Sequence, residues 1–315
     1  MNTEKKSSGW KWFWGILISL VIVSIIFTGI AFIFFAKTIS HSDKRFKYET
    51  YGSGKGKIAV VDLNFTIYTA EPIIRQFKKY REDNSIKAII LRVDSPGGGV
   101  AASQEMYDEI RRTRESGKPI IVSIGSLGAS GSYMASCGGT IIVANPGSLV
   151  GSIGVIAQFI TVKDLAEKLG IKETTVKSGK LKDSGDPFRY LNPDDIDYFQ
   201  DIVNDSFDQF LDIVSKERKI DRDELLKIAN GRVFTGRQAL EHKLVDTLGT
   251  YEDAVKIACN IAKIEGEPVI VKERAVNNFI DIFLNSFSHS ELNELKNEFK
   301  EEFLNKPILQ YKFEK

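Results

Sequence analysis

The chain starts with one long apolar run. Residues 15–36 carry no charge and consist largely of Ile, Val, Leu and Phe, while all three tryptophans lie near the N-terminal edge, at positions 10, 12 and 14. At about 1.5 Å per residue, a helix of this length can cross a bilayer core of about 30 Å. Tryptophan at such an edge is typical of rings seated among lipid headgroups. We therefore expect a short N-terminal segment, residues 1–14, followed by a transmembrane anchor, residues 15–36.

A cleaved signal peptide is the alternative interpretation of this run. The run is longer than the apolar core of a typical signal peptide, and no small-x-small cleavage site follows it. The positive-inside rule does not decide the orientation, because lysines and arginines flank both ends: Lys5, Lys6 and Lys11 before the run, and Lys37, Lys44, Arg45 and Lys47 after it.

After a polar linker at residues 37–57, short apolar runs alternate with amphipathic stretches. This pattern predicts strands at 58–63, 86–93, 119–124, 140–143, 173–176 and 269–272. It predicts helices at 70–82, 101–115, 162–169, 193–219, 221–229, 235–241 and 251–264. Continuous apolar strands between helices indicate an α/β fold with largely buried parallel strands, in one domain over residues 58–274.

The last segment, residues 275–315, is predicted to be a helical extension. Apolar side chains recur there at helical spacing, at Phe279, Ile280, Phe283 and Phe287, before a charged stretch. This face packs on its own domain or on a neighbouring subunit, or it touches a membrane or regulates access to the site.

Composition narrows the function. The chain has 43 basic and 42 acidic residues, so no nucleic-acid partner is indicated. Cys137 and Cys259 fall in apolar helical patterns and read as small buried thiols without metal-ligand spacing. Neither phosphate-loop nor dinucleotide glycine spacing occurs. We expect no metal and no cofactor.

The chemistry begins at Ser130, which follows a predicted strand and opens a short helix. The chain has only three histidines, His41, His242 and His289, and none lies near Ser130 in the sequence. If Ser130 is a nucleophile, a lysine is the expected proton acceptor. A lysine accepts a proton only when neutral, which requires an apolar environment that lowers its pKa below the usual value of about 10.4.

A glycine-rich turn supplies candidate donors for an oxyanion. Asp94-Ser95-Pro96-Gly97-Gly98-Gly99 ends a predicted strand and precedes a helix, so that backbone N–H groups can point at one spot. The amide of Gly131, directly after Ser130, is the expected partner of Gly97 and Gly98 in an oxyanion hole.

Several ordered motifs resemble the signal peptide peptidase A family of serine-lysine membrane peptidases. They are Arg92 to Gly99, Ala129-Ser130-Gly131-Ser132-Tyr133, Gly147 to Val155, Lys177 to Asp183, and Arg232 to Arg237. The resemblance implies the Clp protease/crotonase-like fold, a repeated β-β-α superhelix. It also implies Ser130 as nucleophile, Lys182 as general base, with Lys177 and Lys180 as nearby competitors, and Ser152 as the hydroxyl that orients the lysine.

The resemblance further implies a ring-shaped homo-oligomer in which Ser130 and Lys182 meet across a subunit boundary. We expect a bacterial cell-membrane protein, single-pass, with an extracytoplasmic catalytic domain that cuts hydrophobic peptides such as remnant signal peptides. The alternatives are a crotonase-type acyl-CoA enzyme and a non-catalytic membrane scaffold. Two positions depart from the family pattern, because Ser132 and Lys243 stand where glycine is usual.

Overall fold

The computed structural model describes residues 9–40, 46–275 and 309–312. Helix α1, Gly9–Ser40, contains a window from Trp12 to Gly29 with a mean hydropathy of 2.2 and no buried residue, long and apolar enough to cross a membrane. The predicted helix is confirmed, and α1 is a candidate membrane span.

The described residues after α1 are built on one large sheet with neighbours in the order β1-β11-β2-β3-β5-β6-β10. The strands are β1 Phe46–Tyr51, β2 Lys57–Leu63, β3 Ile86–Ser95, β5 Ile120–Ala129, β6 Ile141–Ala144, β10 Thr247–Leu248 and β11 Val269–Ala275. From β11 to β10 every pairing is parallel. The expected α/β fold with buried parallel strands is therefore confirmed. The repeated β-β-α superhelix stays a prediction.

Short strands extend the sheet near the site. β7, Leu149–Gly151, pairs with the end of β5 and with β9, Val233–Thr235. A second, three-stranded sheet has the order β4-β12-β8, with β4 Gly97–Gly99, β12 Leu309–Lys312 and β8 Ile156–Ala157.

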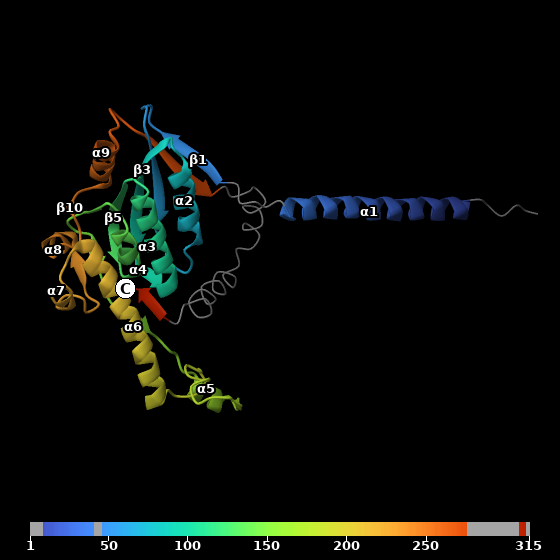
Figure 1. Cartoon of the computed structure of the whole chain (residues 1–315). Coiled ribbons are helices and arrows are strands. Elements are labelled where there is room, and N and C mark those ends of the chain that lie inside the picture. The colour runs from blue at the N-terminus through green and yellow to red at the C-terminus, as the bar shows by residue number, and fades with distance from the viewer. Residues whose placement is uncertain (1–8, 41–45, 276–308, 313–315) are drawn as a thin grey trace, which may run out of the picture. The chain divides into compact units, whose positions relative to one another are not determined.

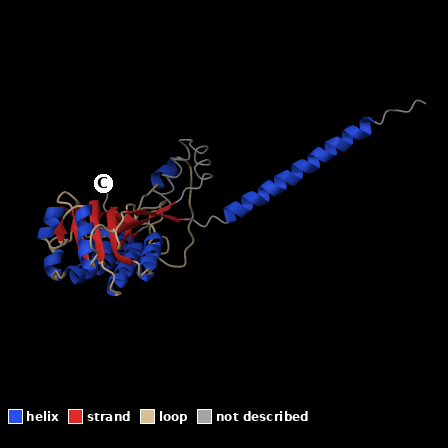
Figure 2. Cartoon of the chain, turned by 90° about the horizontal axis from the view of Figure 1, so that it is seen from above, coloured by secondary structure: helices blue, strands red, loops and turns tan. Residues whose placement is uncertain are grey.

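Helices lie against both faces of the large sheet (Figure 1; Figure 2). Their bounds are α2 Glu71–Glu82, α3 Val100–Glu115, α4 Gly131–Cys137, α5 Lys163–Lys168, α6 Pro193–Arg218, α7 Arg222–Leu226, α8 Gly236–Glu241 and α9 Tyr251–Ala262. Successive side chains of a strand point to opposite faces. In β2, Ala59 and Val61 join the large cluster with α2, α3, α4 and α6, whereas Ile58 and Val60 join the smaller cluster against α9.

Three expectations differ from the structure or lie outside it. No strand forms at residues 173–176, where Val176 is 96% exposed. An apolar β-rich run without a neighbouring strand has no partner for its backbone groups, so this prediction was wrong. β1 lies inside the segment interpreted as a linker. The predicted helix with Phe279 to Phe287 lies outside the described residues, and the described end of that segment is strand β12.

Candidate active site

Ser130 lies in the sharp turn between β5 and α4. Its backbone has φ 56° and ψ −120°, a conformation that residues other than glycine rarely adopt. Its amide donates to the carbonyl of Gly151 at 2.7 Å, and its carbonyl accepts from the amide of Met134 at 2.9 Å. Such backbone costs about 1–3 kcal/mol and is typical of a strand-to-helix turn that presents a nucleophile. The side chain is 1% exposed, and its hydroxyl forms no hydrogen bond within the described part of the chain.

No histidine among the described residues forms a hydrogen bond with Ser130. His242 is the only histidine in the described ranges, and its ring lies edge-on against Phe234 with centroids 4.8 Å apart. His41 and His289 lie outside the described residues.

The glycine turn points one amide away from Ile67, toward β12. Along β4, the carbonyl of Gly97 accepts from the amide of Ile67 at 2.8 Å, and the amide of Gly99 donates to the carbonyl of Ile67 at 2.7 Å. Because neighbouring peptide groups alternate along a strand, the amide of Gly98 points to the opposite side, toward β12. A β-carbon on Gly98 would clash with the backbone of Ile67, so only glycine fits there.

The three predicted oxyanion donors are not equivalent. The amide of Gly97 donates to Ser95 Oγ at 3.2 Å. A β-carbon built on Gly97 would stand 2.6 Å from the amide nitrogen of Gly131, so β4 and the Ser130 turn lie in direct contact. We therefore carry Gly98 and Gly131 forward as the pair of donors for an oxyanion.

Ser152 lies beside this turn, on β7's continuation. Its backbone also has positive φ, at 50°, and its amide donates to the carbonyl of Arg232 at 2.9 Å. The Ser152 hydroxyl donates to the carbonyl of Gly231 at 3.1 Å, which leaves its lone pairs free to accept from an amine. The side chain is 6% exposed, and Gly151, the residue before it, accepts the amide of Ser130.

The three candidate lysines have different surroundings. Lys177 Nζ is 2.6 Å from Asp183 Oδ1, and Lys180 Nζ is 2.5 Å from Asp194 Oδ2. A carboxylate partner favours the ammonium form. The amine of Lys182 forms no ion pair or hydrogen bond among the described residues, and its side chain is exposed. Among the described residues, Lys182 is thus the one of these three lysines without a carboxylate partner.

Among the described residues, no hydrogen bond joins Ser130 to Lys182. Lys182 is exposed whereas Ser130 is buried. Asp183, next to Lys182, lines the same cavity as Lys163 and Glu167 of α5. Figure 1 shows α5 beyond the end of α6, apart from β5 and α4. We call residues 158–192 the lysine arm.

A segment of the chain itself lies over the glycine turn. β12 pairs antiparallel with β4 on one side and with β8 on the other. Tyr311 is opposite Gly98 in this register and is fully buried. An extended peptide therefore fits between these two short strands.

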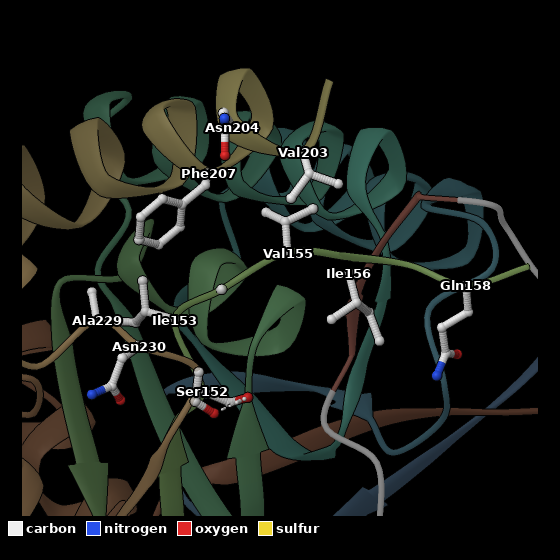
Figure 3. A pocket seen from close by; sticks show the side chains of 12 residues that line it. Ser152, Ile153, Val155, Ile156, Gln158, Val203, Asn204, Phe207, Ala229 and Asn230 are labelled. Carbon is white, nitrogen blue, oxygen red and sulfur yellow. Dashed lines mark hydrogen bonds between the residues drawn. The ribbon is translucent and has the colours of Figure 1, made fainter. Parts of the chain in front are cut away.

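A cavity of about 580 Å³ adjoins Ser152 and is lined by both apolar and polar side chains. Figure 3 shows Val203 and Phe207 of α6 above Val155 and Ile156, with Ser152 below and its hydroxyl on the Gly231 carbonyl. No cluster of three or more His, Cys, Asp or Glu side chains suited to a metal occurs in the described ranges.

Comparison with known proteins gives the family. A model of "Peptidase family S49" matches residues 112–265, and a model of "Clp protease" matches residues 55–146. Proteins named "Putative protease" in Synechocystis and Methanocaldococcus jannaschii are 36% and 38% identical over 219 and 189 residues, or 69% and 60% of this chain. The alignment covers 78% of the Synechocystis protein. The chain belongs to peptidase family S49. The family resemblance seen in the sequence is confirmed.

S49 relatives differ in length. A protein of Enterococcus faecium named "Putative signal peptide peptidase SppA" is 34% identical over 217 residues, which are 69% of this chain and 63% of the relative. The alignment with the Methanocaldococcus protein likewise covers 60% of that relative. The chain therefore spans a little under two thirds of the length of these two relatives.

The two departures from the S49 pattern have local explanations. The Ser132 hydroxyl donates to the carbonyls of Ser95 and Ala129, at 2.7 and 2.8 Å, and ties α4 to β3. Lys243 has φ 61°, the left-handed conformation for which glycine is usual, and its carbonyl accepts from Arg218 Nε at 2.9 Å.

Proposed function

We propose that this S49 chain is a membrane-anchored serine endopeptidase with a Ser130–Lys182 dyad that cleaves hydrophobic peptides such as remnant signal peptides. The observation that carries the proposal is the seating of β12. A peptide segment lies extended between β4 and β8, directly against the turn of Ser130. Strand addition of this kind is a general way to bind a peptide in extended form.

The residues suggest each step of the reaction. Ser130 Oγ bonds to the carbonyl carbon of the substrate as its proton passes to the neutral amine of Lys182. The amides of Gly98 and Gly131 stabilise the resulting oxyanion. Lys182 then donates the proton to the leaving amine as the peptide bond breaks. The same amine later takes a proton from the water that attacks the acyl group, and returns it to Ser130 Oγ as the ester bond breaks.

A second copy of the chain would complete the dyad. The lysine arm exposes many large apolar side chains: Ile160, Leu165, Leu169, Ile171, Val176, Leu181, Phe188 and Tyr190. Clustered exposed apolar side chains mark interaction surfaces. Seating this arm on a neighbouring copy would bury both the apolar side chains and the amine of Lys182, and burial favours the neutral amine that the reaction needs. We propose a ring of such copies.

The candidate membrane span and the cavity beside Ser152 both suit hydrophobic peptide substrates. α1 would hold the catalytic part at the membrane, where hydrophobic peptides remain after secretion. The cavity beside Ser152 offers Val155, Ile156 and Phe207 to apolar side chains of a peptide. An extracytoplasmic catalytic domain on a single-pass bacterial membrane protein is part of this proposal, and the repeated β-β-α superhelix is the fold that the family resemblance implies.

A probe that reacts with activated serines tests the proposal against its alternatives. A fluorophosphonate should attach to Ser130 in the full-length chain, and Ser130→Ala should abolish the labelling, because only an activated serine reacts. Mass spectrometry of the labelled peptide identifies the site. A crotonase-type enzyme or a non-catalytic scaffold has no need of an activated Ser130, so an unlabelled chain that cleaves no peptide would contradict the proposal.

A further inference from the structure

A buried carboxylate lies where the lysine arm meets the start of α6. Asp195 is in the first turn of this helix, and its side chain is completely buried. Its two oxygens accept from the guanidinium of Arg189, Oδ2 from Nη1 and Oδ1 from Nη2 at 2.9 Å. Oδ1 also accepts from Ser184 Oγ at 2.6 Å, and Oδ2 accepts from the amide of Asn192 at 3.0 Å. The carboxylate therefore has four donors, about as many as it can accept.

The pair of Asp195 with Arg189 fixes geometry more than it adds stability. Hydrogen bonds from Arg189 and Ser184 are the main reason that the pKa of Asp195 is lowered, so the carboxylate stays ionised at neutral pH. Taking both charges out of water offsets most of the attraction between them. The two parallel hydrogen bonds of a guanidinium and a carboxylate, however, set the direction in which one segment meets the other.

Arg189 also holds the turn that carries Lys182. Its Nη2 donates to the backbone carbonyl of Asp183 at 2.9 Å and to Asp183 Oδ1 at 3.1 Å. Ser184, which donates to Asp195, is the next residue. The two residues directly after Lys182 are therefore both bonded to the buried pair. We call Asp183, Ser184, Arg189 and Asp195 the clamp.

Apolar packing at Gly185 holds the same turn. Gly185 has φ 86°, and a β-carbon there would stand 2.9 Å from the ring of Phe159 and 3.5 Å from the ring of Phe199 on α6. The centroids of these two rings are 4.2 Å apart. Charged and apolar contacts thus seat the turn after Lys182 against one long helix.

The amine of Lys182 is left out of these contacts. Its neighbours Lys177 and Lys180 both pair with carboxylates. The backbone amide of Lys182 donates to the carbonyl of Gly179 at 3.2 Å, whereas its exposed amine has no partner among the described residues. The chain therefore fixes the backbone on both sides of Lys182 while the amine stays unbound in this part of the chain.

We propose that Asp195 and Arg189 are positioning residues, whose ion pair holds the turn so that the amine of Lys182 reaches the Ser130 of another copy of the chain. The inference rests on the peptidase function proposed above. A general base must lie within hydrogen-bond reach of the proton it takes. A displacement of about 1 Å in a reacting group can cost about 100-fold in rate.

The split between kcat and KM is the first test. Asparagine keeps the shape of Asp195 but turns one acceptor into a donor that faces the donors of Arg189 or Asn192. Asp195→Asn should lower kcat about 100-fold with little change in KM, because the lysine takes part in the reaction and not in holding the peptide. An unchanged kcat would overturn the proposal.

Asp194→Asn is the matched control for this variant. Asp194 precedes Asp195 in the same helical turn, but its carboxylate is exposed and pairs with Lys180 at the surface. Such pairs contribute little, so this chain should keep kcat within about twofold of the wild type. A loss equal to that of Asp195→Asn would show that the buried clamp has no special role.

Mixed assemblies show whether the damage follows the lysine. The Asp195→Asn chain keeps Ser130, and the Ser130→Ala chain keeps both the clamp and Lys182, so their mixture should regain wild-type sites at some boundaries. A mixture of Asp195→Asn with Lys182→Met contains no well-placed lysine and should stay at or below the rate of Asp195→Asn alone. Failure of Ser130→Ala to restore cleavage, whether the Asp195→Asn chain is misfolded or its Ser130 is inactive, would overturn the proposal.

Two measurements distinguish this outcome from failure of the proposed function. If the wild-type chain cleaves no peptide and a fluorophosphonate does not label its Ser130, the peptidase function and the positioning role both fall. If the wild type cleaves, and the mixture of Ser130→Ala with Lys182→Met regains activity, an unrescued or fully active Asp195→Asn chain overturns the positioning role alone.

Discussion

Replacing Ser130 with alanine should lower the rate of peptide cleavage by about 10⁵- to 10⁶-fold, because the group that forms the acyl-enzyme is lost. Alanine tolerates the positive-φ backbone of this turn about as well as serine does, so the fold should persist. The measurement is cleavage of a fluorescent hydrophobic peptide, with circular dichroism to check the fold.

Ser132→Ala provides the matched control in the same turn. Its hydroxyl is buried and, among the described residues, bonds to the carbonyls of Ser95 and Ala129, so its loss should reduce stability by about 1–3 kcal/mol while cleavage persists. Cleavage by the Ser130→Ala chain at a tenth of the wild-type rate or more would assign the reaction to another residue.

Lys182→Met should be nearly as damaging, with a loss of about 10⁴-fold or more, because methionine keeps the length of the side chain and removes the proton acceptor. The wild-type rate should rise toward alkaline pH as the fraction of neutral amine grows, and that rise should vanish from the residual activity of Lys182→Met. The measurement is kcat/KM across pH for both chains.

Two neighbouring lysines serve as controls for that experiment. Lys177→Met and Lys180→Met remove amines that are paired with Asp183 and Asp194, so each should retain most of the cleavage rate. If Lys177→Met or Lys180→Met were inactive and Lys182→Met active, the assignment of the base would move to the other lysine.

The core of the fold could be predicted from the sequence because burial on both faces leaves continuous apolar strands. Such runs predict β2, β3 and β5. The helical periodicity between them predicts α2, α3, α6 and α9. Short strands such as β4 and β7 did not stand out, since segments of three residues form strands only when a partner is already in place. At residues 173–176 a strand was predicted that does not form. These residues have strand propensity but no neighbouring strand in the described structure.

The residues of the site also divide into those that the sequence predicts and those that it does not. The turn of Ser130 and the glycines of β4 carry local signals, namely a serine between small residues after a strand and three consecutive glycines. Tyr311 carries none, because four residues form a strand only between β4 and β8, which lie far away in the sequence. The ion pair of Arg189 with Asp195 was also missed, since both are ordinary charged residues until the start of α6 buries one of them.

The most direct test of the shared dyad mixes two inactive chains. Ser130→Ala retains Lys182, and Lys182→Met retains Ser130, so a ring reassembled from equal amounts of both should regain wild-type sites at roughly a quarter of its boundaries. We predict that peptide cleavage returns in the mixed assemblies and stays absent in each chain alone. Mixed assemblies that form but cleave nothing would contradict the account, because the nucleophile and its base would then have to come from the same chain.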